Sequence, residues 1–156
     1  MSVLTAEPRS NILTPWSSAD YTTLINKAKN PTIPDITTYI FADANDDLEQ
    51  VMFGATVPLA SVVTTFVVNY YILGTTGTQL TVGLRVNNTE EAGQIHTCAG
   101  SKEWGSKTFN TVKTRNNMSQ DLALSFTTPT MPKAAAIFIY RAYIDITGTR
   151  FYPVKT

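Results

Sequence analysis

The sequence predicts an all-β domain, a jelly-roll-like antiparallel β-sandwich with an extended N-terminal arm. Residues 60–73 form a long run of β-branched and aromatic residues, and residues 79–86 alternate strictly between apolar and polar. A period of two is the pattern of a strand with one buried face. The glycine-containing segment 74–77 lies between these runs and predicts a hairpin. Eight or nine such segments, separated by Gly, Asn and Pro, are typical of a sandwich or barrel.

The expected strands follow one another at short intervals. They cover residues 36–41, 48–55, 60–73, 79–86, 92–99, 107–113, 122–126 and 136–146, with a last short one at 151–154. Alternation predicts a core that contains Leu80, Val82, Leu84, Phe138, Tyr140 and Ile144. The opposite face of the last long strand carries Ile137, Ile139 and Tyr143, so we expect an open apolar face that suits a subunit contact.

The chain divides into an N-terminal arm over residues 1–35 and a sandwich domain over residues 36–156. Four prolines interrupt the arm and no alternation is visible there, although residues 19–28 could form one short helix capped by Ser18 or Asp20. The arm is either a flexible leader or a segment that drapes over its own sandwich or a neighbouring subunit. Large apolar residues favour packing, because disordered tails seldom carry so many; they include Ile12, Leu13, Trp16 and Tyr21.

Composition narrows the range of partners. The net charge is zero and only 15% of the 156 residues are charged, which argues against nucleic acid and against a polybasic membrane patch. No apolar run reaches the ~18 residues that span a membrane. The first residues lack a basic end followed by an apolar core, so we expect synthesis in a cytosol without a secretory signal. Cys98 is the only cysteine, so the chain cannot form an internal disulfide.

The residues that could support catalysis are few. His96 is the only histidine, and no glycine-rich nucleophile turn lies near it. Cys98 is two residues away on the same expected strand face, whereas catalytic pairs normally come from different elements around a cleft. We therefore expect a structural role for His96, a buried apolar role for Cys98, no enzymatic activity and no cofactor.

Two binding hypotheses stay open. The acidic turn Asp43–Asp47 could hold calcium through an irregular set of oxygen ligands, but Leu48 and Gly54 stand where an EF-hand needs Gly and Glu. Otherwise it is a solvated turn rich in Asx residues. Trp104 could offer a flat surface to a sugar, or it could plug the core or rim of the sandwich; other aromatics available for a sugar surface are Tyr39, Tyr70, Tyr71, Tyr140, Tyr143, Phe151 and Tyr152.

Three segments together carry a resemblance. They are residues 13–21 (LTPWSSADY), residues 38–42 (TYIFA) and residues 136–146 (AIFIYRAYIDI). This layout resembles the small jelly-roll head decoration, or cement, proteins of tailed bacteriophages. The resemblance implies a non-enzymatic virion protein, made in the host cytoplasm, that binds the outside of the capsid shell as a homotrimer. Its partners would be its own copies and the major capsid protein.

Partner contacts are expected at the arm and at the apolar face of the last long strand. The candidate partner-binding residues are Ile12, Leu13, Trp16, Tyr21, Ile137, Ile139 and Tyr143. The alternative function is a carbohydrate-binding or host-attachment β-sandwich module, which would use Trp104 and the acidic turn.

Overall fold

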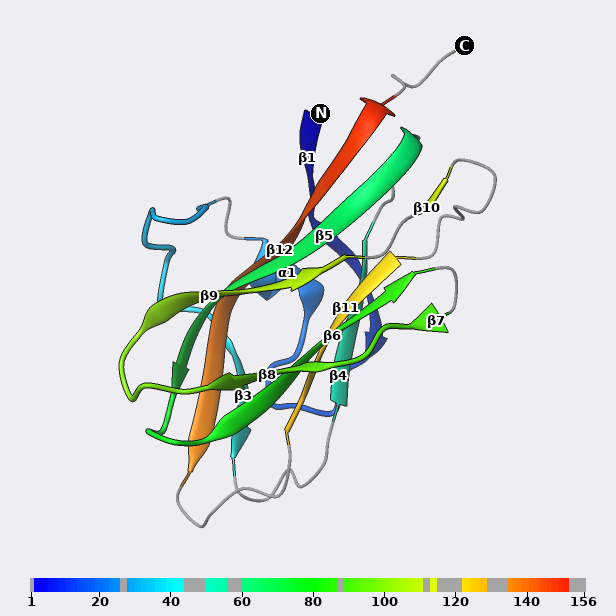
Figure 1. Ribbon diagram of the computed structural model, residues 1–156. Coiled ribbons are helices and arrows are strands. Elements are labelled where there is room, and N and C mark those ends of the chain that lie inside the picture. Colours follow the sequence, from blue (N-terminus) through cyan, green and yellow to red (C-terminus); the bar gives the residue numbers. More distant parts are fainter. Residues whose placement is uncertain are drawn as a thin grey trace.

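The computed structural model describes residues 2–25, 28–43, 50–55, 60–86, 89–110, 113–114, 122–128 and 135–151. It confirms an all-β, jelly-roll-like antiparallel sandwich, in which two sheets face each other (Figure 1). No helix among these residues is long and apolar enough to cross a membrane.

The first sheet, sheet A, is built on two long strands, β5 (Ala60–Gly74) and β12 (Ala136–Phe151), which pair along most of their length. The other edge of β12 pairs with β1 (Ser2–Ala6) and with β3 (Ile40–Asp43). The other edge of β5 pairs with β9 (Glu103–Phe109) and with β10 (Lys113–Thr114). The first and the last of the described strands are therefore neighbours in this sheet.

The second sheet, sheet B, has the order β2 (Pro8–Leu13), β4 (Gln50–Ala55), β11 (Leu122–Thr127) and β6 (Gln79–Val86). The far edge of β6 pairs with β7 (Thr89–Glu90) and with β8 (Gln94–Thr97). The single described helix, α1 (Tyr21–Leu24), lies in the connection between β2 and β3. It is shorter than the helix expected over residues 19–28, and it does begin after Asp20, whose carboxylate accepts from the Thr22 amide.

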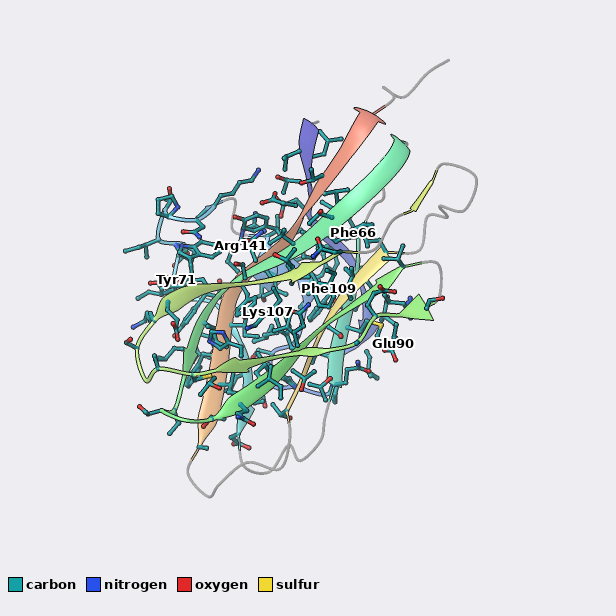
Figure 2. All side chains as sticks on the ribbon, in the orientation of Figure 1. Phe66, Tyr71, Glu90, Lys107, Phe109 and Arg141 are labelled. Carbon is teal, nitrogen blue, oxygen red and sulfur yellow. The ribbon has the colours of Figure 1, made fainter. Side chains whose placement is uncertain are left out.

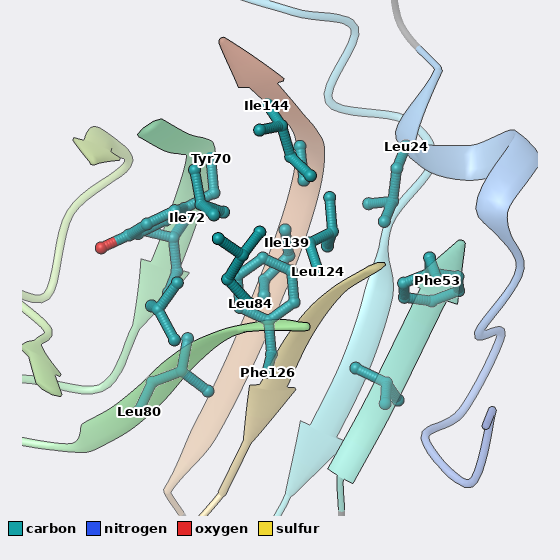
Figure 3. Close-up of a cluster of buried hydrophobic side chains, with 14 of the residues drawn as sticks. Leu24, Phe53, Tyr70, Ile72, Leu80, Leu84, Leu124, Phe126, Ile139 and Ile144 are labelled. Atoms are coloured by element: carbon teal, nitrogen blue, oxygen red, sulfur yellow. The ribbon is translucent and has the colours of Figure 1, made fainter. Parts of the chain in front are cut away.

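The core lies between the two sheets and follows the alternation in sheet B as predicted. Leu80, Val82 and Leu84 are buried, and their polar neighbours face outward. Figure 3 shows how side chains of both sheets meet in this layer; the buried residues labelled there are Leu24, Phe53, Tyr70, Ile72, Leu80, Leu84, Leu124, Phe126, Ile139 and Ile144.

Strand β12 departs from the predicted alternation because it contains a β-bulge. Ile139 pairs with Ile72 and Arg141 pairs with Tyr71, so Tyr140 is one residue too many for the partner strand. Before the bulge, Ile137 and Ile139 face the core and are fully buried; beyond it, the core face passes to the even positions, with Ile144 buried. The prediction that Ile137 and Ile139 lie outside, with Phe138 and Tyr140 inside, is wrong for this reason.

The hairpin predicted between residues 60–73 and 79–86 is also wrong. Strand β5 belongs to sheet A and β6 to sheet B, so residues 75–78 connect the two layers instead. Neighbouring strands already occupy both edges of β5. The connection is held by Cys98, whose carbonyl accepts from the Gly77 amide at 2.9 Å and whose amide donates to the Thr78 carbonyl at 2.9 Å.

Two strands of the first 35 residues, β1 and β2, belong to the sheets of the sandwich. Strand β1 pairs with β12 and β2 pairs with β4, so each sheet gains an edge strand from this segment. Both are edge strands, and the side chains of β2 are exposed at every position after Pro8, which is why no alternation of buried and exposed positions marks β2 in the sequence. Trp16 follows β2 and is 2% exposed, buried in the core of its own chain.

Candidate functional site

A row of seven aromatic side chains crosses sheet A on the face that points away from the core. We call it the outer aromatic row; it consists of Phe41, Phe138, Tyr39, Tyr140, Tyr71, Trp104 and Tyr143. Each ring contacts the next in this order, with centroids 4.9 to 6.0 Å apart and mostly edge-on. The register of β3, β12, β5 and β9 brings these residues together, since Phe41 is paired with Phe138 and Tyr71 with Trp104.

The Trp104 end of the row is covered by the chain's own residues 28–32. The Trp104 indole donates to the Thr32 carbonyl at 3.1 Å, and the Tyr143 hydroxyl accepts from the Asn30 amide at 3.3 Å. Tyr143 is buried, and burial raises the pKa of its hydroxyl. Trp104 keeps only a partly exposed ring. This end of the row is therefore a packed interface within the chain.

Arg141 fastens this covering segment to the sheet. Its guanidinium is fully buried and donates to the carbonyls of Leu24 and Ala28 at 3.1 and 2.8 Å. It also forms a bidentate pair with Glu7, with 2.8 Å between Nη2 and Oε2, and lies 4.5 Å from the ring centre of Tyr143. In Figure 2, Arg141 and Tyr71 lie close together beside β9 and β12.

The row is exposed at its third ring, Tyr39. Tyr39 is 38% exposed, and its ring contacts Phe138 and Tyr140 edge-on at 5.0 and 5.7 Å. Beside it lies a cavity of about 290 Å³ that is lined by Ser18, Thr23, Thr37, Thr38 and Tyr39. Every lining side chain carries a hydroxyl group. The site thus combines an exposed aromatic ring with several groups that can both donate and accept hydrogen bonds.

A tight turn presents Ser18 to this cavity. Ser17 exchanges two backbone hydrogen bonds with Phe41, at 2.9 and 3.0 Å, and the Ala19 amide donates to the Trp16 carbonyl at 3.2 Å. Ser18 has φ of 57°, in the left-handed region that non-glycine residues rarely adopt. Buried Trp16 and the Ser17 bridge to β3 hold the turn in this conformation, and strain of this kind tends to gather at functional sites.

The cavity hydroxyls differ in their availability. The Thr37 hydroxyl donates to Asp35 at 2.7 Å, and the hydrogen bonds from Thr37 lower the pKa of that carboxyl. The hydroxyls of Ser18, Thr23, Thr38 and Tyr39 have no hydrogen-bond partner within the described residues. Four of the five are therefore free to bind a ligand. Sequence patterns gave no signal for Ser18 or Thr23, because they join the site only through the fold.

Most residues expected at a partner interface lie inside the chain. Ile137 and Ile139 are in the core, Trp16 is buried with them, and Tyr21 is half-buried against the core. Tyr143 does lie on the outer face of β12, but residues 28–30 cover it. Only two of these residues, Ile12 and Leu13, are exposed in the single chain.

The other sequence candidates are placed as follows. His96 is buried with Nδ1 2.9 Å from the Tyr70 hydroxyl, and burial lowers its pKa. Cys98 is buried as expected, and burial raises the pKa of its thiol to about 11, which keeps it protonated. Residues 44–47 of the acidic turn lie outside the described residues, as does Tyr152. No cluster of three metal-ligating side chains occurs in the described part of the chain.

No family model and no curated protein matches this sequence. Among solved structures, the chain is similar to a CBM4 carbohydrate-binding module, with a TM-score of 0.50 and 14% identity over 71% of this chain and 72% of that one. A family 35 carbohydrate-binding module from Clostridium thermocellum matches with a TM-score of 0.47 and 10% identity, over 96% and 100% of the two chains. The likeness to the CBM4 module shows that the chain has the β-sandwich fold found in carbohydrate-binding modules.

Proposed function

We propose that this protein is a non-catalytic β-sandwich that binds a saccharide beside Tyr39. The observation that carries the proposal is the exposed Tyr39 ring at the wall of a hydroxyl-lined cavity of about 290 Å³. A sugar ring has an apolar face of C–H groups and an edge of hydroxyls, so it needs one flat apolar surface and several hydrogen-bonding groups. Tyr39 supplies the first, and Ser18, Thr23 and Thr38 supply the second.

Two observations favour this choice over the other functions considered. The chain shares its β-sandwich fold with a CBM4 module, although the likeness is one of fold alone. The catalytic candidates His96 and Cys98 are buried, and each is in an environment that disfavours its reactive form. Residues 28–32 cover Trp104, so we place the saccharide surface at Tyr39, the exposed ring of the same row.

The test is calorimetric titration of neutral soluble oligosaccharides, chosen from a glycan array, with three variants. Tyr39→Ala should weaken binding about tenfold, because it removes the stacking surface. Tyr39→Phe keeps the ring and should retain most of the affinity. Thr23→Val should weaken binding a few-fold through one lost hydroxyl. Thr97→Val, which removes an exposed hydroxyl from β8 in the other sheet, is the matched control and should bind like the wild type.

Two results would contradict the proposal. One is that no glycan on the array binds. The other is that the affinity of a bound glycan is unchanged in Tyr39→Ala while the variant retains the fold.

A second role, decoration of a phage capsid as a homotrimer, stays a prediction that one observation favours. Edge strands β1 and β2 expose Val3, Leu4, Ile12 and Leu13, and edge strands with exposed apolar residues invite pairing with another chain. Light scattering measures the mass directly: a trimer would support this role, and a monomer that never sediments with capsids would refute it.

A further inference from the structure

A second cavity lies on the opposite side of the molecule, on the face of sheet B that points away from the core. It has a volume of about 140 Å³ and is lined by Gln50, Thr81, Gly83, Leu84, Glu90, Glu91, Gly93, Ser125 and Thr127. Figure 2 shows Glu90 at β7, well separated from Tyr71 on sheet A. The cavity is therefore independent of the Tyr39 site.

The register of three strands builds the polar rim of this cavity. Thr127 of β11 is paired with Gln50 of β4 on one side and with Thr81 of β6 on the other. These three side chains thus form a row across the sheet, each half-buried. They supply one amide and two hydroxyl groups, all able to accept a hydrogen bond.

The floor of the cavity is a buried hydroxyl. Ser125 is 5% exposed, and its Oγ lies over Gly83, where a Cβ would clash with it. The Ser125 hydroxyl has no hydrogen-bond partner within the part of the chain that the structure describes. Because Ser125 lines the cavity, its hydroxyl oxygen can accept a hydrogen bond from a group bound there.

The wall of the cavity is negatively charged. Glu90 and Glu91 follow one another in and after β7, and the Glu91 amide is held by the Leu84 carbonyl at 2.8 Å. Arg85 is paired with Glu90 across the strands, but it lies outside the cavity lining. Acceptors therefore outnumber donors, and the described lining residues include no cation. The group that fits best is a cation with donors only, and a primary ammonium has three donors and no acceptor.

We propose that this cavity binds the ammonium group of an amino sugar. The sugar part of this inference rests on the proposed saccharide-binding function, and the ammonium part rests on Glu90, Glu91 and Ser125. At about 140 Å³ the cavity is smaller than the ~300 Å³ of ordinary small-molecule pockets. It therefore takes the charged group and the carbon that bears it, while the rest of the sugar lies across the rim.

The experiment is a titration of the 15N-labelled protein with D-glucosamine and, separately, with D-glucose, followed by amide chemical shifts. The pH is kept below the pKa of the amine. We expect glucosamine to shift the amides of Gly83, Gly93 and Ser125 with saturation, and glucose to leave them unshifted. Added salt should weaken binding, because the carboxylates are partly exposed.

Variants separate the contributions. Glu91→Gln should weaken glucosamine binding about tenfold by removing a charge-assisted hydrogen bond, whereas Glu91→Asp, which keeps the charge, should lose less. Ser125→Ala should weaken binding a few-fold. Asp35→Asn removes one exposed charge on the sheet A side and should bind like the wild type.

The inference is overturned if glucosamine shifts none of these amides, if glucose shifts them equally, or if Asp35→Asn loses as much affinity as Glu91→Gln. Tyr39→Ala distinguishes this site from the first. Glucosamine binding that persists in this variant supports the cavity on sheet B even if no neutral saccharide binds beside Tyr39. Glucosamine binding that Tyr39→Ala abolishes would contradict it.

Discussion

Replacing Arg141 by Met should destabilise the protein by about 3 to 4 kcal/mol, because the buried guanidinium joins three parts of the chain through hydrogen bonds. Its loss leaves the carbonyls of Leu24, Ala28 and Ala142 without their donor. Each such hydrogen bond contributes about 1 kcal/mol. Glu7 adds less than a fully buried partner would, because its side chain is 34% exposed and can be rehydrated.

The assay is urea unfolding with the slope and midpoint compared between variants. Glu7→Gln alone should cost less than Arg141→Met, and the double variant should cost about 1 kcal/mol less than the two single losses together, since both remove the same pair. Hydrogen exchange gives a second readout: the Asn30 and Thr32 amides should exchange faster in Arg141→Met.

A loss below about 0.5 kcal/mol for Arg141→Met, the range of a surface change, would refute this reasoning. So would strictly additive losses in the double variant. Arg141→Lys is the sharper control, because a lysine ammonium keeps the charge but cannot reach the separate carbonyls with a planar fork of donors. It should fall between the wild type and Arg141→Met.

Two further predictions concern the core. Leu84→Ala should cost about 2 to 5 kcal/mol in urea unfolding, because Leu84 is buried, whereas Ile95→Ala at a 56% exposed position should cost less than about 0.5 kcal/mol; equal losses would contradict the assigned core face. Burial lowers the pKa of His96, so the unfolded chain, with a histidine pKa of about 6.5, takes up the proton first. The contribution of neutral His96 to the free energy of unfolding is fully present above that pH. It should decrease as the pH falls below it, until the lower pKa of the folded state is reached. His96→Gln should remove this slope from unfolding curves measured between about pH 5 and 7, and an unchanged slope would exclude His96 as its source.

Alternation predicted the core face of β6 well because this strand has one apolar face and one face of polar or small residues. In β6, Leu80, Val82 and Leu84 alternate with polar or small residues, so the pattern has a single solution. The same rule failed for β12, where residues 137–140 are apolar on both faces. Nothing in such a run marks the position of an extra residue. The sequence therefore could not predict that the buried positions change from odd to even numbers at Tyr140.

The candidate site was within reach of the sequence only in part. Tyr39 and Trp104 belonged to a set of aromatics that could face a sugar, but the pattern did not say which of them lie together. That depends on the register between β3, β12, β5 and β9, whose members lie up to about 100 positions apart in the chain. The part that Ser18 and Thr23 play in the cavity was not predicted, because these residues lie beside Tyr39 only in the folded chain.

The bulge in β12 gives the outer face of sheet A an additional side chain without removing any from the core. Tyr140 and Arg141 both lie opposite Tyr71. One continues the line of aromatic rings toward Tyr39 and the other holds the covering segment in place. With Tyr140 omitted, Ile139 and Ala142 would still face inward and the alternation would run unbroken. Tyr140 is thus an inserted residue that changes the outer face of the sheet and leaves the buried face of β12 as it would be without it. Because of the insertion, two adjacent side chains of β12, Tyr140 and Arg141, contact different parts of the outer face.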